Sequence, residues 1–309
     1  MRAIRHHRFG PPDVLQLDDV PVPEPADGQL RIVVEAAGVH VLDTTIRSGD
    51  PNGPMALPEL PTVPGREVAG VVDAVGPGVS ADWIGSHVVA HLGFTSGGYA
   101  EMAVVAADRA YRVPDGLSSA LAVAAIGTGR TAAGILTIAE LTDDDVVAVT
   151  SAAGGLGVLL VQGAVGAGAR VVGLASRAKR ELVESLGAEF VDYGGDVPEL
   201  SVVLDGVGGA VGRELFARLR QGGRLVRFGW SSGEQNAYAD PERRVLDVLG
   251  PFMLENLTRF ERESLAAAAD GTRVPSVSAF DLADAAAAHR ALEERRTTGK
   301  VVLLTGSAS

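Results

Sequence analysis

Short apolar runs with a strand-like pattern fill the first 118 residues of the chain. Each run is rich in β-branched or small apolar residues and is bounded by Gly, Pro or Asp, which is typical of strands joined by tight turns. The clearest runs lie at 31–40, 67–76, 86–93 and 98–107. This spacing predicts a small barrel-like or sandwich unit.

The pattern changes near residue 119. Residues 118–141 are alanine-rich and helix-like, and residues 143–193 then alternate strand, helix, strand, helix and strand. Such alternation predicts a parallel sheet with helices on its faces. Two further strands are expected at 201–209 and 222–233, each ending in a glycine-containing turn.

The last part of the chain is less regular. Residues 231–262 carry little pattern, and they are followed by a strand-like run at 273–280. A helix is then expected around 281–296 and a last strand at 300–306. No internal repeat is visible, so the chain is an α/β protein whose β-rich part precedes an alternating part.

Composition narrows the possible functions. A length of 309 residues allows about two domains. The net charge of -12 opposes binding to nucleic acid, and the absence of cysteine excludes disulfides, thiolate zinc sites and a cysteine nucleophile. No secretion signal is apparent, and Gly or charged residues interrupt the apolar runs before they reach membrane-spanning length. We therefore expect a cytoplasmic protein.

A candidate phosphate-binding loop follows the strand Val146–Thr150. It has the form Ala152-x-Gly154-x-x-Gly157 and opens a helix. Gly154 would allow the backbone to approach a pyrophosphate, Gly157 would allow close packing of the helix on the strand, and the helix N-terminus would offer free N–H groups. Other glycine-rich stretches exist, but only this one lies between a clear strand and a clear helix. The pattern therefore predicts a dinucleotide site.

The end of the next strand bears on the identity of the dinucleotide. Ser176 and Arg177 stand where NAD-binding chains usually carry an acid, Lys179 and Arg180 follow, and the first acid is Glu181. Hydroxyl and cationic donors suit a ribose 2′-phosphate, which favours NADPH over NADH. The alternative is that these are ordinary solvated residues at a helix start.

Several motifs in sequence order resemble the medium-chain dehydrogenase/reductase superfamily, specifically its zinc-free quinone oxidoreductase branch, which includes zeta-crystallin. AAGVHVLDTTIRSG at 36–49 resembles the branch's AGVNxxDxxxRSG, and GGYAEMAVV at 97–105 resembles its GGYAEYVVV. GRTA at 129–132 corresponds to GLTA, and the stretches SAAGGLGVLLVQ, LDGVGG, GGRLVRFG and TTGKVVL also match. The resemblance covers nearly the whole chain.

The resemblance implies a GroES-like catalytic domain at 1–118, completed by 258–309, and a Rossmann dinucleotide-binding domain at 119–257. It implies a homodimer and a cofactor in the cleft between the domains. The cofactor contacts that it implies are Gly154, Gly155, Leu156 and Gly157 at the pyrophosphate; Ser176, Arg177, Lys179, Arg180, Tyr193 and Arg295 around the 2′-phosphate and ribose; and Thr131, Phe228 and Gly229 near the nicotinamide.

Zinc-dependent relatives bind the catalytic metal through residues at two positions occupied here by His40 and Arg66. Glu67 is a further possible ligand, but a guanidinium has no lone pair to donate and places a positive charge where the metal would lie. The structural zinc lobe of those relatives also needs four cysteines. We therefore expect no metal.

The chain also departs from the zinc-free branch, which usually has Asn at position 40 and often Tyr at position 45, here His40 and Thr45. Arg130 replaces an apolar residue, and Arg66 is unusual. Our hypothesis is that one of the two arginines stabilises an enolate or phenolate oxygen while His40 donates a proton. The alternative for His40 is a hydrogen-bonded structural role.

These features predict an NADPH-dependent, metal-free reductase that transfers a hydride to a quinone or an α,β-unsaturated carbonyl. A small-molecule substrate is expected, with neither a nucleic acid nor a membrane as partner. One alternative is an enoyl reductase that acts on a thioester or polyketide intermediate. The other is a non-catalytic, crystallin-like protein that binds the cofactor.

Overall fold

The computed structural model describes residues 1–51, 55–93, 95–248 and 250–306. It divides into two units, one formed by Met1–Gly127 with Val277–Ser309 and the other by Thr128–Ser276. These units divide the chain after residues 127 and 276, whereas the sequence pattern changes near residue 119 and the family resemblance implies a boundary at 257. Helix α2 (Ser119–Ala124) packs on strands of the first unit, and helix α8 (Leu257–Ala269) packs on helix α3 of the second.

The first unit is built on one large sheet, with strand order β14-β15-β3-β4-β5-β7 and β6 paired to β3. Neighbouring strands are antiparallel except β14 and β15, which are parallel. Strands β1 (Arg2–Arg5) and β2 (Gln16–Asp19) form a separate antiparallel pair. The bounds of the others are β3 Gln29–Val39, β4 Glu67–Val75, β5 His87–His91, β6 Met102–Ala106, β7 Ala110–Arg112, β14 Val277–Asp281 and β15 Lys300–Leu304.

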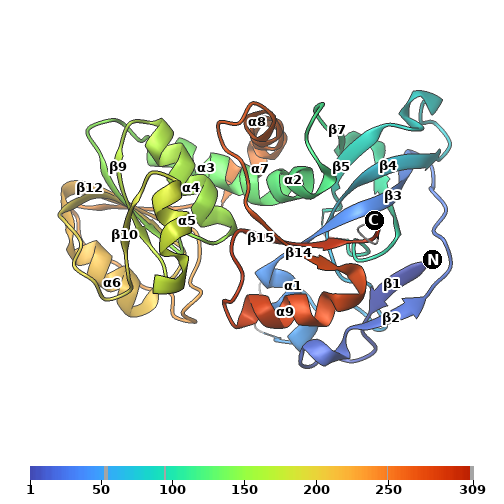
Figure 1. The fold of residues 1–309 in the computed structure, drawn as a ribbon, viewed down its shortest axis with the longest axis horizontal. Helices are drawn as coiled ribbons and strands as arrows, with labels where there is room; N and C mark the ends of the chain where they lie inside the picture. Colours follow the sequence, from blue (N-terminus) through green and yellow to red (C-terminus); the bar gives the residue numbers. More distant parts are fainter. Residues whose placement is uncertain (52–54, 94, 249, 307–309) are drawn as a thin grey trace. The chain divides into compact units, whose positions relative to one another are not determined.

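Three α-helices and the C-terminal segment complete this unit (Figure 1). They are α1 (Val41–Ser48), α2 and α9 (Ala285–Glu293), and short 3-10 turns lie at Pro12–Val14, Ala81–Trp83, Ala107–Arg109 and Leu282–Asp284. Helix α9 lies against β14 and β15. Alternate residues of β3, among them Leu30, Ile32 and Val34, point into the core, as expected of a sheet with one buried face.

The second unit is a doubly wound parallel sheet of order β10-β9-β8-β11-β12-β13. The strand order changes direction at β8, with β9 and β10 on one side of it and β11 to β13 on the other. Folds of this kind bind ligands at such a point, at the carboxyl edge of the strands. The strands are β8 Val146–Thr150, β9 Arg170–Leu174, β10 Glu189–Val191, β11 Leu200–Asp205, β12 Leu219–Arg227 and β13 Arg244–Asp247. The helices are α3 Arg130–Ala139, α4 Gly155–Gly166, α5 Arg180–Ser185, α6 Gly209–Ala217, α7 Pro251–Glu255 and α8, with a 3-10 turn at Arg177–Lys179.

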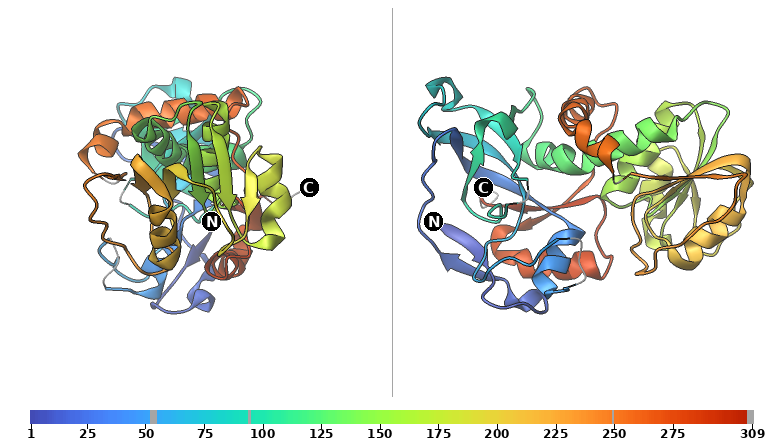
Figure 2. Two further views of the ribbon diagram at one scale, coloured as in Figure 1. Left: turned by 90° about the vertical axis from the view of Figure 1, so that its left-hand side faces the viewer. Right: turned by 180° about the vertical axis from the view of Figure 1, so that it is seen from behind.

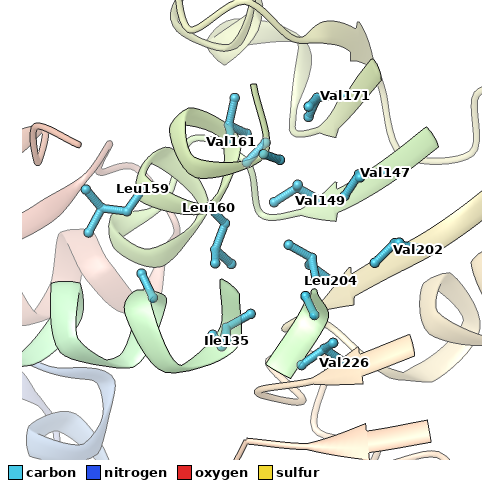
Figure 3. Close-up of a cluster of buried hydrophobic side chains, with 14 of the residues drawn as sticks. Ile135, Val147, Val149, Leu159, Leu160, Val161, Val171, Val202, Leu204 and Val226 are labelled. Carbon is cyan, nitrogen blue, oxygen red and sulfur yellow. The ribbon is translucent and has the colours of Figure 1, made fainter. Parts of the chain in front are cut away.

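Apolar residues cover both faces of this parallel sheet. One face carries Val147, Val149, Val202 and Leu204 and packs against helices α3 and α4, as Figure 3 shows. The other face packs against α6, where Leu215 is buried. Strands buried on both faces need continuous apolar runs, which explains the VVAVT and SVVLD patterns of the sequence.

The segment 231–262, which carries little sequence pattern, contains regular structure at its end. It holds β13, α7 and the start of α8, and Figure 2 shows these elements from two further sides. Only the start of helix α8 falls in this poorly patterned segment, and its Phe260 is fully buried against the other helices.

The helix-like stretch at 118–141 is confirmed as a helix, but it is more apolar than expected, since the apolar runs were expected to be interrupted before they reach membrane-spanning length. Ser119–Ala139 is helical throughout, with a π-helical turn at Ala125–Gly129, and it is long and apolar enough to cross a membrane by composition alone. Its glycines and Arg130 interrupt the apolar run without ending the helix. In its most apolar window 67% is buried inside the structure, as in the core helix of a soluble protein.

Candidate functional site

The predicted phosphate-binding loop lies at the carboxyl edge of the parallel sheet, between β8 and α4. Gly154 stands before the first residue of α4 in an extended conformation, and Gly155, Leu156 and Gly157 form the first turn. A Cβ on Gly157 would lie 2.0 Å from the Ser151 carbonyl oxygen, so only glycine fits there. The helix N-terminus therefore approaches the strand closely and leaves its first N–H groups free for an anion.

The residues expected around the 2′-phosphate gather at the same edge of the second unit. Ser176 and Arg177 follow β9, and the Arg177 side chain is 83% exposed with its Nε 3.6 Å from Asp192. The Tyr193 hydroxyl, after β10, accepts a hydrogen bond of 3.1 Å from the Ser151 N–H, at the start of the phosphate loop. Five predicted cofactor residues are thus brought together here, namely Ser176, Arg177, Lys179, Arg180 and Tyr193.

The cationic residues of this group differ in how far other protein groups already engage them. Arg180 stacks on the Phe190 ring at 4.4 Å and pairs with Glu184 at 3.0 Å, so its guanidinium is already engaged. Burial lowers the pKa of Lys179. Arg177 is therefore the most accessible of the three cations.

The remaining predicted cofactor residues are distributed over both units. Thr131 lies half-buried in α3, and Phe228 and Gly229 follow β12, where a Cβ on Gly229 would lie 3.0 Å from the Gly206 carbonyl oxygen. Arg295 belongs to the first unit, where it adopts a left-handed conformation with φ of 56° after helix α9.

The structure also reveals a residue at this edge that the sequence reasoning did not single out. Asp205 ends β11 and is 1% exposed. Its Oδ1 accepts hydrogen bonds from the backbone N–H groups of Val207 at 2.9 Å and Gly208 at 3.1 Å. It therefore fixes the loop after β11, and an acid at the end of a buried strand was the available signal.

A buried polar cluster occupies the first unit, where β3, β4 and β15 lie side by side. His40 follows β3, Glu67 begins β4 and Lys300 begins β15. The His40 Nε2 lies 2.7 Å from the Glu67 Oε2 and 2.7 Å from the Lys300 Nζ, and the Lys300 Nζ lies 3.1 Å from the same Glu67 oxygen. The three polar atoms therefore form a triangle of mutual contacts.

Glycines make room for this cluster. A Cβ on Gly38 would lie 2.5 Å from the Glu67 Oε2, and a Cβ on Gly127 would lie 1.6 Å from the Glu67 Oε1. The Glu67 side chain is fully buried and that of Lys300 is 5% exposed, whereas that of His40 is 24% exposed. His40 is therefore the member of the cluster that a small molecule can reach.

The charges of the cluster depend on one another. Burial alone would raise the pKa of Glu67, but the neighbouring His40 and Lys300 hold it well below its ordinary value, so the carboxylate is ionised. Burial lowers the pKa of Lys300, and the attraction of Glu67 opposes that shift. Removal of His40 or Lys300 would leave the buried Glu67 carboxylate with a single cationic or hydrogen-bonding neighbour.

The donor set does not fit a divalent metal. Arg66 has no lone pair, and the ammonium of Lys300 contacts both of the other side chains that could bind a metal, His40 and Glu67. A second cation at this point would be repelled by the first. Within the described ranges, no group of three or more His, Cys, Asp or Glu residues is arranged to hold a metal ion.

Arg66 does not pair with its neighbour Glu67. Gly65, with φ of 90°, packs so closely on Tyr99 that a Cβ would lie 2.2 Å from that ring. The Arg66 Nε then lies 3.8 Å from the Asp43 Oδ1, and its Nη1 contacts the Met55 sulfur at 3.3 Å. The Arg66 guanidinium is therefore directed away from Glu67 and toward Asp43 and Met55.

Asp43 links Arg66 to the His40 backbone. Its Oδ2 accepts hydrogen bonds from the His40 N–H at 2.8 Å and from the Tyr99 hydroxyl at 3.0 Å. Because that hydroxyl donates to Asp43, we assign the proton of His289 to Nε2, which lies 3.1 Å from the Tyr99 oxygen. Burial lowers the pKa of His289 to about 4, so it is neutral at pH 7.

Arg130, the other arginine of the hypothesis, forms an ion pair within the second unit. Its Nη1 lies 2.5 Å from the Glu261 Oε1, and both side chains are mostly buried. Its charge is therefore already balanced by a carboxylate of α8, and Arg66 is the better candidate for a charge offered to a ligand.

Comparisons with known proteins define the class of this fold and site. Residues 26–115 match the family described as "Alcohol dehydrogenase GroES-like domain", and residues 186–303 match "Zinc-binding dehydrogenase". Together with the doubly wound nucleotide-binding unit, these matches define a dehydrogenase/reductase.

Individual relatives identify the branch. The chain is 34% identical to "Quinone oxidoreductase" of Sus scrofa, over 98% of each chain, and 32% identical to "2-haloacrylate reductase" of a Burkholderia species, over 96% of this chain and 97% of the relative. An Escherichia coli quinone oxidoreductase complexed with NADPH aligns with a TM-score of 0.86 at 27% identity, over 99% of this chain and 100% of that one. A mycobacterial protein complexed with NADPH aligns at 0.84 and 33% identity, with the same coverage. The chain belongs to the quinone oxidoreductase branch of the medium-chain dehydrogenase/reductase superfamily.

Proposed function

We propose that the protein is an NADPH-dependent, metal-free reductase that transfers a hydride to a quinone or an α,β-unsaturated carbonyl compound. The observation that carries the proposal is that one chain contains both a glycine loop that opens a helix closely packed on its strand and the His40–Glu67–Lys300 cluster. The names of the relatives support the same chemistry, since quinones and haloacrylates are both conjugated acceptors. When bound, NADPH supplies the hydride and leaves as NADP⁺.

The second unit would hold the cofactor. The first turn of α4, from Gly154 to Gly157, would offer backbone N–H groups to the pyrophosphate, and Gly157 lets that turn pack closely on the strand. Ser176 and the exposed Arg177 would bind the 2′-phosphate, and a guanidinium suits a phosphate better than a carboxylate side chain would. Thr131, Phe228 and Gly229 are proposed to lie near the nicotinamide.

His40 is proposed to supply the proton that completes the reduction. Addition of a hydride leaves an extra electron pair on the acceptor, and a proton must arrive at carbon or oxygen to neutralise it. His40 is the most exposed of the three side chains, and the Lys300 Nζ lies 2.7 Å from its Nε2. Lys300 would therefore replace a proton that His40 gives up, while Glu67 holds the Lys300 ammonium in place.

Arg66 is proposed to stabilise the oxygen that gains negative charge. A metal ion has this role in zinc-dependent relatives, and a fixed guanidinium can provide the same stabilisation without exchangeable ligands. The arrangement around Asp43 keeps the Arg66 Nε at 3.8 Å, so that carboxylate does not form a hydrogen-bonded pair with it.

The proposal is tested first by NADPH oxidation with a panel of quinones and enones, in which a purely cofactor-binding protein would show no turnover. Single-turnover kinetics then test the residues with Arg66→Met and His40→Ala. We expect each variant to slow the hydride-transfer step at least tenfold, which corresponds to about 1.4 kcal/mol of barrier. If both variants stay within about twofold of the wild type, the roles of Arg66 and His40 are wrong.

A cytoplasmic location and a homodimer belong to the same proposal. Both follow from the sequence and from the resemblance to this branch. Light scattering after size-exclusion chromatography would measure the mass in solution, and a mass of twice 31.8 kDa is expected. A mass of one chain would contradict the dimer.

A further inference from the structure

A pocket that is partly open to solvent lies within the first unit, beside helix α1 and the segment that leads into β4. Apolar residues form much of its wall, namely Ile46, Met55, Ala56, Pro58 and Pro64. Thr62, Thr95 and Ser96 add hydroxyl groups, so the cavity suits a small molecule with an apolar body and a polar end.

Two guanidinium groups line this cavity, and neither has all of its donors satisfied. Arg47 has a side chain that is 3% exposed, and its Nη2 donates to Glu293 at 2.6 Å. Its Nε and Nη1, and the Nε of Arg66, are buried without a hydrogen-bond partner among the described residues. Buried donors without an acceptor are costly, and in a native protein they indicate a missing acceptor group.

The charges in the wall favour an anion as that group. Arg47 and Arg66 are the cations, and Asp43 is the carboxylate of the lining. The Asp43 Oδ2 is already occupied by the His40 N–H and the Tyr99 hydroxyl. Burial lowers the pKa of His6, which also lines the cavity, so this histidine is neutral at pH 7. Arg47 is paired with Glu293, so the charge left for a ligand is that of Arg66, whose Nε lies 3.8 Å from Asp43 without a hydrogen bond.

Arg66 is the guanidinium that a ligand can reach. Its side chain is 12% exposed, against 3% for Arg47, and its Nη1 is held only by the Met55 sulfur, a weak acceptor. A carboxylate offers two oxygens in the geometry of the guanidinium fork. Arg47, which is more deeply buried, would add electrostatic attraction and its unsatisfied N–H donors.

We propose that this cavity binds a carboxylate carried by the acceptor, so that the substrate is a small α,β-unsaturated carboxylic acid. The inference rests on the reductase function proposed above and narrows its substrate class. In such an acid the carboxylate is the group that withdraws charge when a hydride adds to the β-carbon and a proton to the α-carbon. Arg66 would then bind the substrate and stabilise the developing charge through the same contact.

Binding to the cofactor-free protein tests the site separately from turnover. The matched ligands are trans-but-2-enoate and the neutral isostere pent-3-en-2-one, whose dissociation constants are measured by calorimetry. The variants are Arg66→Met and Arg47→Met, with Arg2→Met as a control, because Arg2 is an exposed arginine of the same unit paired with Glu101. Circular dichroism checks folding, and Arg66→Met alone suffices if Arg47→Met does not fold.

We expect the wild type and Arg2→Met to bind the carboxylate at least tenfold more tightly than the ketone. Arg66→Met should lose that preference while its affinity for the ketone stays within twofold. Equal affinities for the two ligands in the wild type, or an equal loss for both in Arg66→Met, would overturn the anion site.

Turnover separates the two proposals. Reduction of neutral enones by a protein without carboxylate preference would support the reductase and overturn the anion site. Carboxylate binding without oxidation of NADPH by any acceptor would overturn the reductase, and with it the assignment of the acid as a substrate. Reduction of but-2-enoate that depends on Arg66 would support both.

Discussion

The buried ion pair between Lys300 and Glu67 makes the sharpest prediction for stability. Its atoms lie 3.1 Å apart, and the carboxylate is fully buried. With an effective dielectric constant of ~20, the attraction at this distance is about 5 kcal/mol, part of which offsets the cost of burying both charges. Lys300→Met leaves the carboxylate with His40 alone, so we expect a loss of about 3 kcal/mol in the free energy of unfolding at pH 7.

The pH dependence of this loss follows from the direction of the pKa shift. The pKa of Glu67 is held below its ordinary value of 4.5, so the pair stabilises the protein fully above that pH and loses its effect as the pH falls further. The difference between the wild type and Lys300→Met should therefore shrink in acid, where the variant's carboxyl is protonated and its burial costs less.

Urea unfolding followed by tryptophan fluorescence measures this loss of stability in the first unit of the structure. The chain has two tryptophans. A Trp230→Phe background leaves Trp83 as the reporter of the first unit. Glu67→Gln and the double variant complete a cycle in which the double variant should be destabilised by clearly less than the sum of the two single losses. Additivity within about 0.5 kcal/mol would refute the coupling of the two side chains.

Three further predictions concern other parts of the molecule. The pKa of His289 is lowered from 6.5 to about 4, so the free energy of unfolding of the wild type should fall by up to about 3 kcal/mol as the pH falls from 6.5 to 4. In urea unfolding, His289→Gln should show a smaller change of stability over this pH range. Gly157→Ala should weaken NADPH binding at least tenfold in a fluorescence titration, whereas Gly166→Ala in the same helix, where a Cβ meets nothing within 4 Å, should leave it unchanged; equal effects would contradict the close-approach argument. Arg177→Ala should raise the dissociation constant of NADPH about tenfold and that of NADH less than twofold, and a similar change for both would exclude a 2′-phosphate contact.

The sequence predicted the nucleotide-binding unit well because its signals are local. A strand followed by Gly154, Gly157 and a helix indicates the start of a strand–helix–strand unit in a parallel sheet. The structure confirms the parallel sheet with its doubly wound order. The β-rich unit was expected from short apolar runs, and the family resemblance supplied its completion by the C-terminal strand. The start of helix α8 was missed because residues 257–262 carry little pattern and are held by the packing of Phe260.

The His40–Glu67–Lys300 cluster was only partly predictable. His40 and Arg66 were found because they stand at positions that relatives use for a metal, and Glu67 was noted there. Lys300 was not considered, since it lies 233 positions beyond Glu67 and only the pairing of β15 with β3 brings it close. Arg47 was likewise read as part of a motif, and its unsatisfied donors are visible only in three dimensions.

The most direct test of the account is the fate of the hydride. The protein is incubated with NADPH that carries deuterium at the reactive C4 position, together with a conjugated acceptor such as but-2-enoate or an enone, and the product is analysed by mass spectrometry. The account predicts one deuterium per product molecule, at the β-carbon, with one equivalent of NADP⁺ formed. Oxidation of the cofactor without deuterium in the product, or no oxidation with any quinone, enone or unsaturated acid, would contradict it.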